Sequence, residues 1–193
     1  MSPDSLSLDI IIPVYNEGGN IVAVLESLRN SVKTPFRVLI CYDKDDDDTL
    51  PAVRSYGPQD FDIVFVKNRS RGAHAAVCSG FAASDARAVL VFPADDVTNA
   101  ATIDRMAEKI REGHDIVAAS RFIKDGCMKG CPWLKAVLVR MAAFTLHTFA
   151  KLPTHDATNG FRMFSRRLIK QIPIESSVGF TYSLELLVKC HRL

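Results

Sequence analysis

Short apolar segments alternate with segments of helical spacing through the first 120 residues, and this alternation constrains the fold more than any other feature. Apolar runs rich in β-branched residues are typical of parallel strands that helices cover on both faces. The alternation therefore predicts an α/β fold with a doubly wound, mostly parallel sheet. The expected strands are residues 8–14, 36–42, 61–67, 88–92 and 115–119, and the expected helices between them include 20–32, 73–83 and 102–112.

Length and composition indicate one ordinary globular domain spanning residues 1–193. The 24 Lys and Arg residues nearly balance 22 Asp and Glu residues, which argues against a nucleic-acid partner. The first residues lack the basic and apolar parts of a signal peptide, so we expect a cytoplasmic protein. The five cysteines lie mostly in apolar runs, as reduced, buried thiols do.

Acidic residues follow two of the predicted strands. Asp43 comes directly after the second strand, and Asp95 and Asp96 follow the fourth. Ligands of open α/β sheets bind at the carboxyl ends of the strands, and carboxylates gathered there repel one another unless a cation or a hydrogen-bonding ligand uses them. We therefore expect an acidic, metal-assisted pocket. For residues 45–48 a solvated turn before a helix is the alternative.

Three common α/β functions lack their motifs. No Gly-x-Gly-x-x-Gly follows the first strand and no Gly-Lys-Ser/Thr loop occurs, which argues against a dinucleotide oxidoreductase and a P-loop NTPase. The absence of a Gly-x-Ser-x-Gly elbow argues against an α/β-hydrolase.

Six motifs follow one another in order from about residue 8 to the end of the chain. They are Ile11-Ile12-Pro13-Val14-Tyr15-Asn16-Glu17, Asp43, Arg71-Gly72-Ala73, Pro93-Ala94-Asp95, Ser120-Arg121-Phe122 and Asp156-Ala157-Thr158-Asn159-Gly160-Phe161-Arg162. This ordered set resembles the motifs of the family-2 inverting glycosyltransferases of the GT-A fold. The last two motifs are similar to the branch of dolichyl- and polyprenyl-phosphate mannose synthase-like enzymes.

The resemblance implies transfer of a sugar from a GDP- or UDP-linked donor to a polyprenyl-phosphate acceptor. Asp95, supplemented by Asp96, would hold Mg²⁺ or Mn²⁺ on the donor diphosphate. Arg121 and Arg162 would face phosphate oxygens, and Asp156 would lie near the anomeric carbon, as a base or as a group that orients the acceptor. Contacts with the nucleotide are implied for Pro13, Tyr15, Glu17, Asp43, Arg71 and Ala94.

Two features keep alternatives open. Pro93 replaces the first aspartate of the family's Asp-x-Asp metal motif, which allows a catalytically dead nucleotide-sugar-binding paralogue. The chain ends within an apparent helix at Leu193, so an incomplete, C-terminally truncated chain is also open. A soluble glycosyltransferase that extends a glycan or polysaccharide is the third alternative.

Residues 132–152 form an apolar stretch with Trp133 near its start and basic residues within it. The interruptions leave it short of a membrane-crossing helix. It is either a buried core helix or an interfacial helix with Trp133 at the headgroup level, and the second case predicts peripheral contact with the cytoplasmic face of a membrane.

Overall fold

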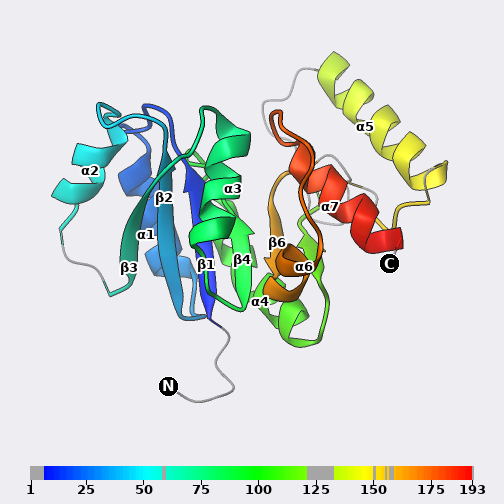
Figure 1. Ribbon diagram of the computed structural model, residues 1–193, viewed down its shortest axis with the longest axis horizontal. Helices are drawn as coiled ribbons and strands as arrows, with labels where there is room; N and C mark the ends of the chain where they lie inside the picture. Colours follow the sequence, from blue (N-terminus) through cyan, green and yellow to red (C-terminus); the bar gives the residue numbers. More distant parts are fainter. Residues whose placement is uncertain are drawn as a thin grey trace.

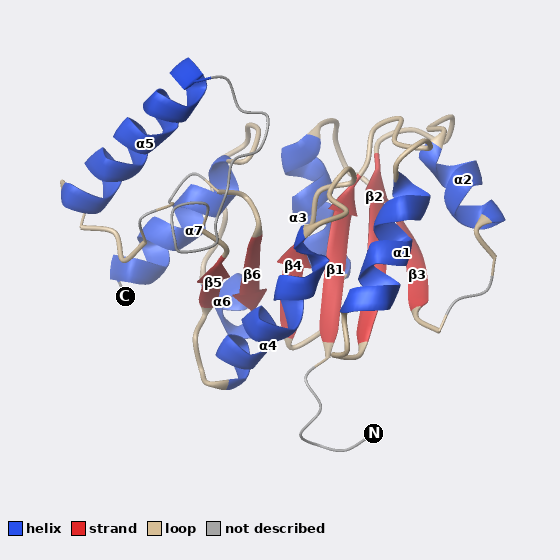
Figure 2. Ribbon diagram, turned by 180° about the vertical axis from the view of Figure 1, so that it is seen from behind, coloured by secondary structure: helices blue, strands red, loops and turns tan. Residues whose placement is uncertain are grey.

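The computed structural model describes residues 7–57, 60–120, 133–149, 151–154, 156 and 159–192. Its centre is a six-stranded sheet with the order β3-β2-β1-β4-β6-β5 (Figures 1 and 2). β1 pairs in parallel with β2 and β4, whereas β6 runs antiparallel to β4 and β5. The strands are β1 (Leu8–Pro13), β2 (Phe36–Tyr42), β3 (Asp62–Lys67), β4 (Ala88–Val91), β5 (Ile116–Ala118) and β6 (Arg162–Ser165).

Helices pack on both faces of the sheet because the strand side chains alternate. Ile10 and Ile12 contribute to one core, which α1, α2 and α4 cover, and Ile11 contributes to the other, which α3, α6 and α7 cover. The helices are α1 (Ile21–Ser31), α2 (Thr49–Ser55), α3 (Ala73–Ala83), α4 (Ile103–Arg111, after a 3₁₀ turn η1 at Asn99–Thr102), α5 (Trp133–Thr148), α6 (Arg166–Gln171) and α7 (Thr181–Arg192).

A glycine sets the distance between α3 and the sheet. A Cβ on Gly80 would lie 2.7 Å from Cδ1 of Ile11, closer than real carbon atoms approach. Because Gly80 lacks a side chain, α3 packs directly against β1, and the start of α3 is brought to the carboxyl end of the strands.

The predicted doubly wound sheet with helices on both faces is confirmed, and the expected strands and helices appear within two residues of their predicted ends. Hydrophobic patterns did not give the bounds of four short elements, α2, η1, β6 and α6, although the turn alternative for residues 45–48 expected a helix after them. Each has seven residues or fewer, too short for a hydrophobic period to show.

α5 lies outside the two cores, beside α7 (Figures 1 and 2). Its described side chains include Trp133, Met141 and Phe144, which are 77%, 61% and 65% exposed, while Ala143 is buried. The expectation of a buried core helix is therefore wrong for these side chains. Among the described residues no helix has both the length and the apolar character needed to cross a bilayer.

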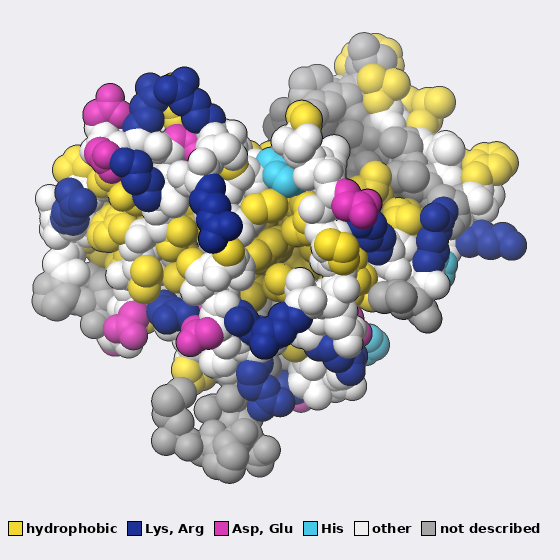
Figure 3. Space-filling view, in the orientation of Figure 1, with side chains coloured by type: hydrophobic (Ala, Val, Ile, Leu, Met, Phe, Trp, Pro, Cys, Tyr) yellow, Lys and Arg dark blue, Asp and Glu magenta, His cyan; other side chains and the backbone are white. Residues whose placement is uncertain are grey.

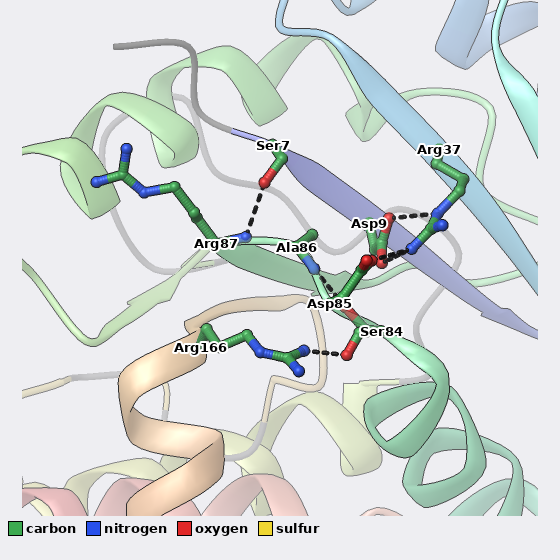
Figure 4. Close-up of polar contacts among 8 residues, drawn as sticks. All are labelled: Ser7, Asp9, Arg37, Ser84, Asp85, Ala86, Arg87 and Arg166. Carbon is green, nitrogen blue, oxygen red and sulfur yellow. Dashed lines mark hydrogen bonds and ion pairs between the residues drawn. The ribbon is translucent and has the colours of Figure 1, made fainter. Parts of the chain in front are cut away.

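A closed network of charges lies at the amino end of the strands (Figure 4). The guanidinium of Arg37 on β2 donates two hydrogen bonds to the buried carboxylate of Asp9 on β1, at 2.9 and 2.8 Å. It also pairs with Asp85 at 2.6 Å. Arg166 at the start of α6 donates to the carbonyl of Ser84. These contacts tie β1, β2 and the loop before β4 together.

Candidate active site

The strand register gathers most of the predicted site residues at one edge. Pro13 at the end of β1 pairs with Cys41 near the end of β2, and Ile11 pairs with Val91 at the end of β4. Val91 in turn pairs with Arg162, the first residue of antiparallel β6. The strand order reverses between β1 and β4, because the chain adds β2 and β3 on one side of β1 and β4 on the other. Ligands of open α/β sheets bind at such a switch point.

The loop after β1 is held by the acidic run that follows β2. The backbone N–H of Asn16, which has a positive φ of 54°, donates to Oδ2 of Asp47 at 3.2 Å. The next two residues donate their N–H groups to Thr49 Oγ1 and to Asp48 Oδ1, at 2.9 and 2.8 Å. Asp47 and Asp48 therefore shape the loop and precede α2, as the turn alternative predicted. Tyr15 stays exposed at the edge.

Asp43 orients the turn that precedes α3. Its Oδ1 accepts a hydrogen bond from Asn68 Nδ2 at 2.8 Å, and its Oδ2 accepts one from the N–H of Gly72 at 2.9 Å. Gly72 has φ 98°, a conformation that favours glycine. The half-buried Asp43 carboxylate is thus fixed beside Arg71. Sequence reasoning missed Asn68, whose only signal was its position directly after the third strand.

Asp95 and Asp96 have different surroundings. Asp96 accepts hydrogen bonds from the N–H groups of Thr98 and Asn99 and from both of their side chains. Burial opposes ionisation of Asp96, but these hydrogen bonds outweigh it and lower its pKa. Asp95 is exposed, and no hydrogen bond or ion pair of its carboxylate occurs within the described part of the chain. Asp95 is therefore the more available oxygen ligand, and Ala94 is buried beside it.

Arg162 and Asp156 lie inside the protein. Both are fully buried, and Arg162 donates to the carbonyl oxygens of Ser183 and Asp156 at 2.6 and 3.4 Å. Burial lowers the pKa of Arg162 to about 10, although Tyr182 and Asp156 act in the opposite direction. The structure brings these two predicted residues together beneath the edge. Arg121 falls outside the described residues.

A cavity of about 300 Å³, here called the α3 cavity, opens beside the start of α3. In Figure 3 a hollow separates the part of this face that carries α3 from the part that carries α6 and α7, and a histidine side chain lies in it. No sequence pattern groups the residues of this cavity, because they come from two distant segments. The cavity is lined by Arg69, Ser70, Arg71, His74, Ala75, Cys78, Ser79, Ser176 and Ser177.

The donor groups fit a divalent cation only in part. No cluster of three or more His, Cys, Asp or Glu side chains that could hold a metal occurs among the described residues. Asp95 offers one carboxylate, and Mg²⁺-type ions commonly complete their coordination with water and substrate phosphates. The residues present therefore suit an ion that arrives with a phosphate ligand.

Comparison with known proteins identifies the family. Residues 9–173 match the family model for glycosyl transferase family 2. The chain belongs to this family. Its fold is similar to that of glucosyl-3-phosphoglycerate synthase from Mycobacterium tuberculosis, crystallised with Mn²⁺, uridine diphosphate and glucosyl-3-phosphoglycerate, with a TM-score of 0.72 at 18% identity over 97% of this chain and 66% of that chain. The predicted family and the GT-A fold are confirmed.

Curated relatives of this family-2 chain include sugar transferases named for lipid phosphates. The polyprenol monophosphomannose synthase of Mycolicibacterium smegmatis is 26% identical over 92% of this chain and 69% of that protein. The dolichol-phosphate mannosyltransferase of Pyrococcus furiosus is 23% identical over 95% and 53%. The putative glycosyltransferase CsbB of Bacillus subtilis is 26% identical over 91% and 53%. The chain spans about half the length of the last two.

Proposed function

We propose that this chain is the catalytic domain of a glycosyltransferase that moves a sugar from a nucleotide-sugar donor to a polyprenyl phosphate. The single observation that carries the proposal is that Asp95, whose carboxylate no described residue engages, lies at the same sheet edge as the oriented Asp43. The relatives named for polyprenol and dolichol phosphate support the choice of acceptor.

In the proposed reaction the donor lies across the switch point. Asp43 accepts a hydrogen bond from a base N–H, which uracil and guanine both offer, while Pro13, Tyr15, Glu17, Arg71 and Ala94 line the nucleotide. Asp95 would hold a divalent cation, which would supply positive charge to stabilise the leaving diphosphate. The acceptor oxygen displaces the nucleoside diphosphate directly at C1, with inversion.

The burial of Asp156 supports a phosphate acceptor over a sugar hydroxyl. A hydroxyl needs a base within hydrogen-bond reach, and a fully buried carboxylate does not offer one at the surface. A phosphate monoester has a second pKa of about 6 and is already largely ionised at pH 7. We therefore propose that Asp156 and Arg162 hold the start of β6 in place beside the carboxyl end of β4. Arg121 remains a proposed phosphate contact.

The exposed apolar face of α5 supports peripheral contact with the membrane that holds the lipid acceptor. Trp133, Met141 and Phe144 would enter the interface between headgroups and acyl chains. Flotation with vesicles of anionic lipid doped with polyprenyl phosphate tests this contact. Replacing Met141 and Phe144 by serine should abolish flotation, whereas the control Val97→Ser, at an exposed valine before α4, should not. Equal flotation of both variants would contradict a role for α5.

Calorimetry with UDP and GDP, in Mn²⁺ and then in EDTA, tests the donor site. We expect one nucleotide to bind, and to bind more weakly in EDTA. Binding of neither would contradict the proposed function. Binding with no transfer to a polyprenyl phosphate would favour the second candidate, a nucleotide-sugar-binding paralogue without turnover. The replacement of a metal-ligand aspartate by Pro93 and the engagement of Asp96 by Thr98 and Asn99 favour that candidate.

A further inference from the structure

We infer that the α3 cavity is a binding site for a phosphoryl group, held by Arg69 and Arg71 on one side and by the hydroxyl groups of Ser176 and Ser177 on the other. The inference deepens the proposed function and rests on it for the source of the phosphate. It adds Arg69, His74 and Ser176 to a site for which the sequence motifs supplied Arg71 alone.

The two arginines carry the positive charge that an oxyanion needs. Neither Arg69 nor Arg71 forms an ion pair within the described residues, although both line the cavity. The nearby carboxylates are engaged by other groups. Asp43 binds Asn68 and Gly72, and Glu185 accepts from Lys189 and from the backbone N–H groups of Glu175 and Ser176. A planar guanidinium that is always charged suits a phosphate.

The wall of the cavity is already held in position. His74 Nε2 lies 3.3 Å from Ser176 Oγ, and its Nδ1 lies 3.6 Å from Cys78 Sγ. The imidazole packs edge-on against the buried ring of Tyr182, with 6.0 Å between ring centroids. Ser79 Oγ accepts the backbone N–H of Arg69 at 3.2 Å, which fixes the backbone of this arginine. Because these groups are already held in place, little conformational entropy is lost when an anion binds.

The backbone adds donors of the right kind. The first intrahelical hydrogen bond of α3 runs from Ala76 to the carbonyl of Gly72, so the N–H groups of the first turn have no acceptor within the helix. Ala75, in that turn, lines the cavity together with the hydroxyl groups of Ser70 and Ser177. Two guanidinium groups, several hydroxyls and helix N–H groups match a tetrahedral phosphate better than a carboxylate or a neutral sugar.

Two phosphates of the proposed reaction share this chemistry. Gly72, which donates its N–H to Asp43, directly follows Arg71 in the wall of the cavity. The cavity therefore lies close to the carboxylate proposed to bind the base, and this position suits a phosphate of the donor nucleotide. The Ser176–Ser177 side belongs to the segment that leads into α7, away from the nucleotide strands, which suits the phosphate monoester of the acceptor. Both sources present the same oxyanion.

The test is a titration with inorganic phosphate at constant ionic strength, followed by NMR of the His74 ring and the Ala75 amide. We expect both resonances to shift and saturate. Arg69→Gln should weaken phosphate about tenfold, the usual size for a lost charge-assisted hydrogen bond. The matched control is Arg87→Gln, since Arg87 is an exposed arginine at the opposite end of the sheet (Figure 4). The phosphate affinity of this variant should differ from that of the wild type by less than twofold.

Repeating the titrations with UDP or GDP, and with a short-chain polyprenyl phosphate in micelles, assigns the source. An Arg69→Gln effect on nucleotide affinity identifies the donor phosphate, and an effect on the lipid identifies the acceptor phosphate. Resonances that do not move, or equal weakening by Arg69→Gln and Arg87→Gln, would overturn the inference while leaving nucleotide binding, and the proposed function, intact. A phosphate response without any nucleotide binding would remove the proposed function instead.

Discussion

Two groups of charged side chains, one at each end of the sheet, differ in their pairing. At the amino end, Arg37 binds Asp9 and Asp85, so these three charges have partners of opposite sign. At the carboxyl end Lys67 pairs with Asp45, but Arg69, Arg71 and Asp95 have no ion pair within the described residues. Charges that neutralise one another tie strands together, whereas charges without partners contribute little to stability and remain available for a ligand.

The same division runs through the carboxyl end itself. Asp47 and Asp48 accept backbone N–H groups of the first loop, and Asp96 accepts those that begin the segment before α4. Asp95 does neither. An aspartate at a strand end is therefore informative about function only after its hydrogen bonds have been accounted for, because turns and helix starts use the same residue.

The largest effect on stability should come from the paired end. Asp9→Ala removes a buried carboxylate that accepts two hydrogen bonds from Arg37, and we expect the free energy of unfolding to fall by about 3 kcal/mol. Chemical denaturation measures the change. Asp85→Ala removes the exposed partner of the same arginine and should destabilise far less. Similar losses for the two variants would mean that burial of Asp9 does not matter.

Replacement of Asp95 at the carboxyl end of the sheet should change activity rather than stability. Asp95→Asn should leave the free energy of unfolding within about 0.5 kcal/mol of the wild type, since the side chain is exposed and makes no described contact. Sugar transfer, measured with Mn²⁺ present, should fall about a hundredfold, because charge on the leaving diphosphate loses its stabilisation. EDTA should reduce the wild type to a similar level. An active variant would remove Asp95 from the metal site.

The sequence predicted the sheet well because its strands are apolar on both faces and the intervening helices have a clear period. It also singled out Asp43 and Asp95 as candidate site residues, since each follows a buried strand within four residues. The family motif ranked Asp95 above Asp96 as a cation ligand, but the sequence did not show that Asp96 is engaged by Thr98 and Asn99, because these hydrogen bonds depend on loop conformation. The α3 cavity was out of reach for another reason: residues 69–79 and 176–177 meet only through the packing of α3 and α7 on one face.

A smaller effect should distinguish Asp96 from its neighbour. Asp96→Ala removes the acceptor for the N–H groups of Thr98 and Asn99, and loss of such hydrogen bonds costs about 1 kcal/mol of unfolding free energy. Denaturation of this variant beside Asp95→Asn gives the comparison. If Asp96 holds this turn, its replacement lowers stability and Asp95→Asn does not. The reverse order would assign Asp96 to the cation and Asp95 to the fold.

The smallest effect concerns the wall of the α3 cavity and depends on pH. Burial alone would raise the pKa of Glu185, but hydrogen bonds from Lys189, from Ser176 and from the N–H of Glu175 lower it to about 2. A carboxyl whose pKa is lowered by folding stabilises the folded form above its unfolded pKa of about 4.3, and that contribution is lost as the pH falls toward 2. We expect the free energy of opening at Ser176 to fall by less than about 1 kcal/mol over this range, because Lys189 is partly exposed.

Hydrogen exchange of the Ser176 amide, corrected for the intrinsic rate at each pH, measures this loss. Glu185→Gln is the matched control, since it keeps the shape of the side chain but does not titrate. Its opening free energy should be lower at neutral pH and flat between pH 5 and pH 2. A wild-type profile as flat as that of the variant would show that Glu185 does not hold the Ser176 wall, and phosphate affinity in the α3 cavity should then be independent of pH below 5 apart from protonation of phosphate itself.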